Sequence, residues 1–245
     1  MHLKAVTLHP EQFPTSEYYP FNLPVFHKTP RLTFDTPVTL FVGENGAGKS
    51  TLLQALANRC GIHIWRYRDF GNGDSNPYAD MFHNCITIEW TDGRVPGSFF
   101  GSAIFQSFAE LLDEWAATDP RHLEYFGGHS LTTLSHGQSL MSFFRTRYRI
   151  KGLYLLDEPE TALSPKSQLE LLEIITEMSK AGHAQFIVAT HSPILLACPN
   201  AVIYSFDYAP VKPICYEETD HYRIYAQFMN DRSKYVRTDA SSIKI

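Results

Sequence analysis

The sequence predicts an α/β fold with a largely parallel central sheet flanked by helices. In two regions, 35–60 and 150–205, short apolar runs rich in β-branched and aromatic residues alternate with helical patterns. Such alternation is typical of parallel strands joined by crossover helices. The composition agrees, because 44% hydrophobic and 19% charged residues suit a 245-residue chain that buries a core. We therefore expect one domain over 1–245.

The first half of the chain contributes strands, loops and one clear helix. Six prolines among the first 37 residues exclude a long helix and indicate extended segments and loops. A buried strand is expected at 38–42, followed by a helix from 49 to about 59. An alternating run at 86–90 ends in a Thr-Asp-Gly turn, which predicts one arm of a hairpin and hence a small antiparallel part.

The second half continues the alternation. Ser164 and Pro165 can cap and open a helix that Gly182 can close. The tail after these elements is polar and aromatic. Helices are expected at 103–117 and 135–149, and strands at 153–157, 186–189 and 202–204.

Charge, cysteines and hydropathy restrict the classes of function. A net charge of −5 gives no overall basic field, so charge does not support a nucleic-acid partner, although one is not excluded. The four cysteines lack C-x-x-C spacing, which favours reduced thiols in a cytoplasmic protein. No run approaches 18 apolar residues, so direct membrane insertion is not expected.

One segment fits the phosphate-binding pattern G-x-x-x-x-G-K-[ST] at every specified position, between an expected strand and an expected helix. Glycines let the backbone wrap a phosphate, and the helix N-terminus faces the anion. Lys49 is expected to reach the β- and γ-phosphates of ATP, and Ser50 to ligate Mg²⁺. The segment reads Gly43, Glu44, Asn45, Gly46, Ala47, Gly48, Lys49, Ser50, with Thr51 next.

Two acids follow the apolar residues of the expected strand at 153–157, one as its last residue and one directly after it. A carboxylate at the carboxyl end of a buried strand lies where ligands bind in such sheets. Asp157 is therefore predicted to hold the Mg²⁺ shell, and Glu158 to act as general base on the attacking water. Without the phosphate loop, the same pair would equally suit a solvated turn.

Together these motifs resemble the ABC-type ATPases. Leu134-Ser135-His136-Gly137-Gln138 is similar to the LSGGQ signature of that family, and Ala162-Leu163-Ser164 to its D-loop. His191, just after an expected strand, resembles its switch histidine. The motifs are most similar to those of stand-alone soluble AAA/ABC ATPases with SMC-like heads, but without a coiled-coil insertion between Lys49 and Ser135. The resemblance implies a P-loop NTPase fold with a helical signature subdomain at about 95–150.

The resemblance also implies a mechanism. It implies an ATP-dependent head-to-tail homodimer in which Ser135 and Gly137 of one chain contact the γ-phosphate held by Lys49 of the other. Gln138 completes this nucleotide-binding set, and His191 is expected to contact the γ-phosphate near Glu158. On its own, a histidine such as His191 is more often structural.

Two elements of the family pattern have more than one interpretation. Gln106 is the best candidate for the Q-loop glutamine that would reach the metal, but it equally suits an exposed helix position. Phe21 or Phe26 is expected to stack on adenine, with core packing as the alternative. Three functions remain open: a soluble ATPase that switches an unidentified protein partner, a transporter energising subunit, and a DNA or RNA repair or defence ATPase.

Overall fold

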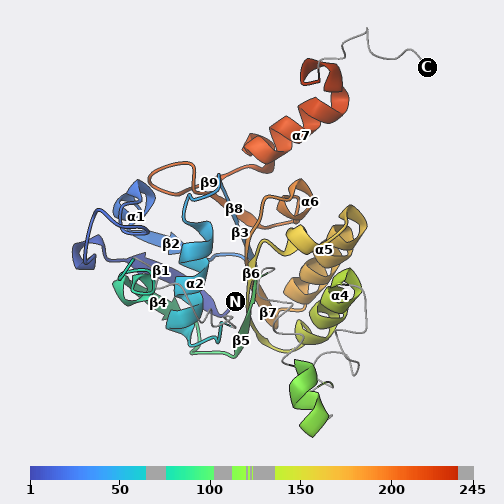
Figure 1. Cartoon of the computed structure of the whole chain (residues 1–245), viewed down its shortest axis with the longest axis horizontal. Coiled ribbons are helices and arrows are strands. Elements are labelled where there is room, and N and C mark those ends of the chain that lie inside the picture. Colours follow the sequence, from blue (N-terminus) through green and yellow to red (C-terminus); the bar gives the residue numbers. More distant parts are fainter. Residues whose placement is uncertain (65–75, 102–111, 120, 122, 124–135, 237–245) are drawn as a thin grey trace.

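The computed structural model describes residues 1–64, 76–101, 112–119, 121, 123 and 136–236. The described strands form two sheets (Figure 1). The larger one confirms the predicted mixed, mostly parallel sheet, because only its last strand runs antiparallel to its neighbour. Its strands, in spatial order, are β5 (Gly97–Gly101), β6 (Gly152–Asp157), β7 (Ala184–Ala189), β3 (Val38–Val42), β8 (Val202–Ser205) and β9 (Lys212–Ile214).

The smaller sheet is antiparallel, and two of its three strands come from the proline-rich first 37 residues. Its order is β2 (Arg31–Thr33), β1 (Leu3–Leu8) and β4 (Ile86–Trp90). The predicted strand at 86–90 is therefore correct, but the predicted hairpin is wrong. β4 pairs with β1, and after the turn the chain enters β5 of the other sheet, because long-range packing sets strand partners more strongly than a local turn does.

Helices cover both faces of the large sheet. Helix α2 (Lys49–Cys60) lies between the two sheets, while α4 (His136–Arg147) and α5 (Pro165–Lys180) cover the opposite face (Figure 1). The remaining bounds are α1 (Pro24–Lys28), α6 (Pro193–Leu196), α7 (Asp220–Asn230), η1 (Pro10–Gln12), η2 (Phe82–Cys85), η5 (Pro159–Ala162), η6 (Tyr216–Glu218) and η7 (Arg232–Lys234). Residues 112–118 are also helical.

Local rules account for the helix ends that the sequence predicted. The Ser164 side chain caps α5 by accepting a hydrogen bond from the Ser167 amide, and Pro165 occupies the first turn. Gly182 follows the end of α5 with a φ of 76°. Of the range predicted as a helical subdomain, residues 97–101 form strand β5. The subdomain itself stays a prediction, since residues 102–111, 120, 122 and 124–135 of it lie outside the described ones.

A buried glutamine ties the two sheets together. The Gln185 side chain, fully buried on β7, accepts hydrogen bonds from the amides of His2 and Leu3 at 2.7 and 2.8 Å. Its own amide donates to the Leu3 carbonyl at 2.8 Å. All three bonds replace hydration that this polar side chain loses on burial. The β1 end of the small sheet is thereby fixed against the large one.

Both aromatic candidates for adenine stacking belong to the core. Phe21 is 0% exposed and Phe26 is 1% exposed, and both pack against Phe82. The expectation that one of them stacks on a base is therefore wrong, because neither presents a free ring face. Within the residues that the structure describes, no helix is both long enough and apolar enough to cross a bilayer.

Candidate nucleotide site

The phosphate loop joins the central strand to a helix N-terminus. β3 is buried along its whole length, and α2 begins at Lys49. Gly48 has a φ of 101°, and a Cβ there would lie 2.7 Å from Phe26 Cζ, so both conformation and packing require glycine. Gly46 has a φ of 81°, and a Cβ at that position would meet no atom of the described residues within 4 Å, so these leave open space over the crest of the loop. This is the arrangement that an anion needs at a helix N-terminus.

Lys49 is buried and already held by the loop. Its Nζ donates to the carbonyls of Gly43 and Glu44 at 2.6 and 3.0 Å. Burial lowers the pKa of Lys49, and the nearby carboxylates, with Glu158 the strongest, oppose that shift. An ammonium that has lost its hydration among acids favours an added anion, as a phosphate would provide.

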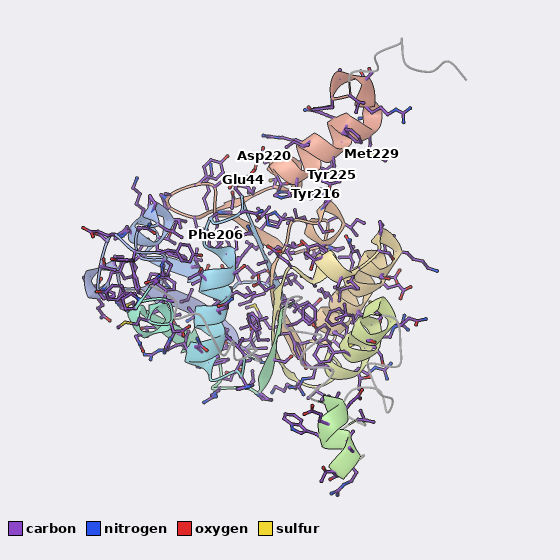
Figure 2. All side chains as sticks on the ribbon, in the orientation of Figure 1. Glu44, Phe206, Tyr216, Asp220, Tyr225 and Met229 are labelled. Atoms are coloured by element: carbon purple, nitrogen blue, oxygen red, sulfur yellow. The ribbon has the colours of Figure 1, made fainter. Side chains whose placement is uncertain are left out.

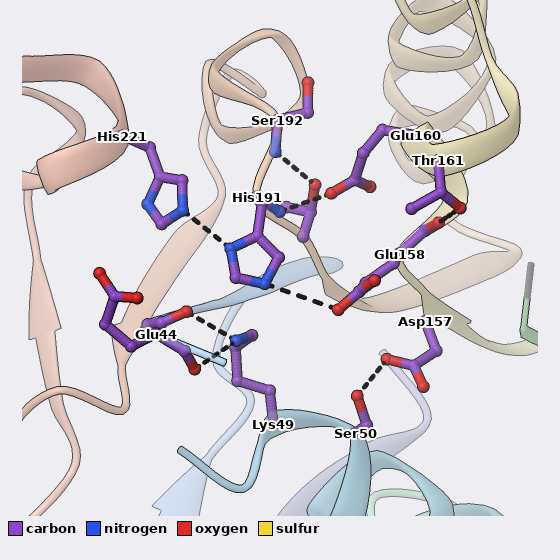
Figure 3. A network of polar contacts seen from close by, with 12 residues as sticks. Glu44, Lys49, Ser50, Asp157, Glu158, Glu160, Thr161, His191, Ser192 and His221 are labelled. Atoms are coloured by element: carbon purple, nitrogen blue, oxygen red, sulfur yellow. Dashed lines mark hydrogen bonds and ion pairs between the residues drawn. The ribbon is translucent and has the colours of Figure 1, made fainter. Parts of the chain in front are cut away.

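Ser50 and Asp157 lie together although 107 positions separate them in the sequence. The Ser50 hydroxyl donates to Asp157 Oδ1 at 2.7 Å (Figure 3). Burial raises the pKa of Asp157 to about 6, despite that hydrogen bond and the charge of Lys49. Two adjacent hard oxygen ligands, one of them a carboxylate in need of a cation, fit Mg²⁺. The residues present therefore suit the metal that the sequence predicted.

Glu158 points away from its neighbour. It has a left-handed backbone, with φ of 46° and ψ of 55°, which is uncommon for a residue other than glycine. Its amide donates to the Ala189 carbonyl at 2.9 Å. Its Oε1 lies 3.5 Å from Nε2 of His191 (Figure 3). The strained backbone thus directs the two acids to different partners, Asp157 to Ser50 and Glu158 to His191.

His191 is held on three sides. Its backbone amide donates to Oε1 of half-buried Glu160, and its Nδ1 lies 2.9 Å from His221 Nε2. Its Nε2 is buried and has no hydrogen-bond partner among the described residues. Burial lowers the pKa of His191, as do the charges of Lys49 and His221. A neutral ring with one buried nitrogen left unsatisfied, beside Glu158, is suited to contact a bound ligand.

Parallel strand register explains why these groups meet. Phe41 of β3 pairs with Ala189 of β7, and Ala189 pairs with Asp157 of β6. The phosphate loop, His191 and the two acids therefore leave the same edge of the sheet at the same level. Ligands bind at this carboxyl edge in open α/β sheets.

The signature residues are only partly described. Gly137 and Gln138 lie in the first turn of α4, on the face of the large sheet opposite α2, while Ser135 and Gln106 lie outside the described residues. Among the described residues, a Cβ at Gly137 would meet only the Ala162 carbonyl, at 3.9 Å, so packing against them does not require glycine there. The roles assigned to all four residues stay predictions.

Sequence reasoning missed three side chains at the site. His221 comes from the first turn of α7, in a tail predicted only to be polar. Asp207 accepts from the Glu44 amide at 2.8 Å, and Tyr19 shares a hydrogen bond with Thr51 just after the loop. None belongs to a motif, so only the fold identifies them. Among the residues with described positions, no three His, Cys, Asp or Glu side chains gather as a metal site.

Comparison with known proteins agrees with this geometry. A family model described as "AAA domain, putative AbiEii toxin, Type IV TA system" matches residues 135–197, and a second, "AAA domain", matches 22–75. The "Probable siderophore transport system ATP-binding protein YusV" of Bacillus subtilis is 25% identical over 67% of this chain and 64% of its own length. The "Hemin import ATP-binding protein HmuV" of Bradyrhizobium diazoefficiens is 29% identical over 58% and 59%.

The matches thus span less than two thirds of these two relatives. Among solved structures, the "SMC head domain from Thermotoga maritima" aligns with 88% of this chain and 100% of its own, at 15% identity and a TM-score of 0.49. The two family models cover the phosphate loop, the strand-end acids and His191, and the curated relatives are ATP-binding proteins. The chain is thus similar to P-loop ATPases of the ABC and AAA type.

Proposed function

We propose that this chain binds Mg²⁺ and ATP and hydrolyses ATP as a head-to-tail dimer that switches a partner. The observation that carries the proposal is the convergence of Lys49, the Ser50–Asp157 pair and the Glu158–His191 pair at one sheet edge. These groups supply an anion cradle, an oxygen pair for the metal, a base and a polar contact. Together they are the parts that phosphoryl transfer to water requires.

Each side chain has a chemical role in this proposal. Lys49 and the loop amides bind the β- and γ-phosphates, and Ser50 and Asp157 hold the metal. When bound, Mg²⁺ neutralises charge on the phosphate oxygens. Glu158 accepts a proton from the attacking water, and His191 contacts the γ-phosphate through its buried Nε2. Placement by the sheet makes most of this catalysis positional.

The dimer is proposed from the resemblance of the motifs and from the position of α4. The start of α4 lies on the sheet face opposite α2, and packing among the described residues gives Gly137 no reason to be glycine. A bare backbone and a helix N-terminus form a second anion site that becomes useful when a phosphate on another subunit reaches it. Ser135 and Gln138 are proposed to join Gly137 there, with Gln106 as the Q-loop residue.

The proposal is tested by Glu158→Gln. This change keeps the shape of the side chain and removes the base, so the hydrolysis rate should fall roughly 10²- to 10⁴-fold while ATP binding is retained. Trapped ATP should then hold the dimer together, which light scattering after gel filtration with and without ATP would measure. Glu173→Gln, on α5 and outside the site, is the matched control. A Glu158→Gln variant that stays monomeric with saturating ATP contradicts the dimer.

A second candidate is the energising subunit of a transporter. It is favoured by the names of the curated relatives, which include siderophore and hemin transport. It predicts that the chain co-purifies with membranes and that a transmembrane partner stimulates its ATPase. The repair or defence alternative predicts instead that DNA or RNA ends stimulate the rate, with a steep dependence on salt.

The partner and the compartment are part of the same proposal. We propose an unidentified protein partner for the switch. We also propose a cytoplasmic place of action, because all four cysteines are free. Affinity capture with Glu158→Gln and ATP, followed by mass spectrometry, would identify the partner. The wild-type chain without ATP is the comparison, and a protein enriched only in the trapped state would be the switched one.

A further inference from the structure

His221 reaches the site from an element that is otherwise separate from it. Helix α7 projects from the body of the molecule (Figures 1 and 2), with Tyr225 and Met229 56% and 79% exposed. Among the described residues, the contacts that anchor the helix to the body are made at its beginning. Thr219 is buried and caps the helix by accepting from the Tyr222 amide, and the Tyr216 hydroxyl donates to the Pro193 carbonyl at 2.9 Å.

The contact between the two rings is a hydrogen bond and not a stack. His191 Nδ1 and His221 Nε2 are 2.9 Å apart, the ring centroids are 5.0 Å apart, and the planes are tilted by 51°. Burial lowers the pKa of both histidines, and the charge of Lys49 adds to the effect. Two neutral imidazoles each carry one N–H, so one ring must donate and the other accept.

The surroundings of His191 select the direction of that bond. Its other nitrogen, Nε2, faces Oε1 of Glu158 at 3.5 Å and, in the proposed function, the γ-phosphate of ATP. Both neighbours are acceptors, so Nε2 must carry the proton and Nδ1 must accept. The donor available to Nδ1 is the Nε2–H of His221. A partner on one ring nitrogen is the usual way to fix which tautomer the other presents.

We infer that His221 is a positioning residue that donates from Nε2 to His191 Nδ1 and thereby holds the His191 Nε2–H toward the γ-phosphate. The inference rests on the proposed ATPase function for its kinetic consequence, but not for the tautomer itself. Without His221, His191 can carry its proton on either nitrogen and can rotate. A contact made in the transition state would then be weakened, which lowers kcat more than it raises KM.

Two variants and one control separate positioning from packing. His221→Ala should lower kcat about tenfold, the size typical of losing an orienting partner, with little change in the KM for ATP. His221→Gln, whose amide can donate from a similar place, should recover most of the loss. Met229→Ala, at the exposed end of the same helix, should behave as wild type. Equal kcat in wild type and His221→Ala would overturn the inference.

A measurement without nucleotide keeps the inference independent of activity. Nitrogen-15 NMR of histidine-labelled protein, with His191 assigned from a His191→Gln sample, reports which ring nitrogen carries the proton. We expect the Nε2–H form in wild type and a mixture in His221→Ala. An Nδ1–H form in wild type, or an unchanged spectrum of His191 in the variant, would refute the inference. A wild type that hydrolyses no ATP but shows the Nε2–H form would instead refute only the proposed function.

Discussion

Asp157→Asn should stabilise the nucleotide-free protein while removing its response to Mg²⁺. The Asp157 carboxyl is largely buried at the end of β6, and burial raises its pKa from the ordinary 3.8 to about 6. At neutral pH the ionised carboxylate therefore lowers the free energy of unfolding. Asparagine keeps an oxygen that can accept from the Ser50 hydroxyl, which now lies 2.7 Å from Oδ1, and removes the charge.

The two pKa values give the size and the sign of the effect. Between them, the folded state binds more protons than the unfolded state, so the free energy of unfolding falls as pH rises. At 1.36 kcal/mol for each pKa unit, the full penalty is about 3 kcal/mol. Roughly half of it is present at pH 5, and nearly all of it at pH 8. The stability advantage of Asp157→Asn should therefore grow by about 1 kcal/mol or more over that range.

Urea unfolding at pH 5 and pH 8, without Mg²⁺ or nucleotide, would measure the difference in free energy of unfolding between Asp157→Asn and wild type. Asp92→Asn, which removes a carboxylate from an exposed turn, is the control and should change stability by less than about 0.5 kcal/mol at either pH. Adding Mg²⁺ and ATP should then stabilise wild type more than Asp157→Asn. If Asp157→Asn is no more stable than wild type at pH 8, or if the stability difference is equal at both pH values, the reasoning is refuted.

Three further variants test the phosphate loop and the hydrogen bonds of Gln185 that link the two sheets. Lys49→Ala should keep the fold and abolish ATP binding, measured with a fluorescent ATP analogue, because the charge that the loop holds is lost. Gly48→Ala should lose about 1–3 kcal/mol in urea unfolding, since the new Cβ meets Phe26 and the backbone φ is 101°. Gln185→Leu should lose at least about 2 kcal/mol, because it leaves the buried amides of His2 and Leu3 unpaired.

Much of the site could be predicted from the sequence because its chemistry is local. The phosphate loop is a run of adjacent residues whose glycines and lysine act through their own backbone and side chains. The strand that ends at Asp157 and the strand before His191 are buried apolar runs, which length and composition distinguish well. Periodicity and capping residues are also sufficient to predict α2 and α5.

The features that could not be predicted depend on contacts between distant segments. The run at 86–90 has the alternation of a strand, but its partner is β1, at the far N-terminal end of the chain. Phe21 and Phe26 have the composition expected of a base-stacking segment, yet both are buried. In each case the residue type correctly indicated a strand or an apolar side chain. Its partner was set by packing against residues far away in the sequence, which a local pattern does not show.

The same distinction explains why His221 differs from the rest of the site. Lys49, Asp157 and His191 are placed by three adjacent parallel strands, whose spacing of roughly 4.8 Å leaves little freedom. His221 is placed by the first turn of a helix whose other turns are exposed. A displacement of α7 would leave the sheet-bound groups where they are and change only the partner of His191 Nδ1. If His221 positions His191 as we infer, ATP binding would then persist while hydrolysis slowed.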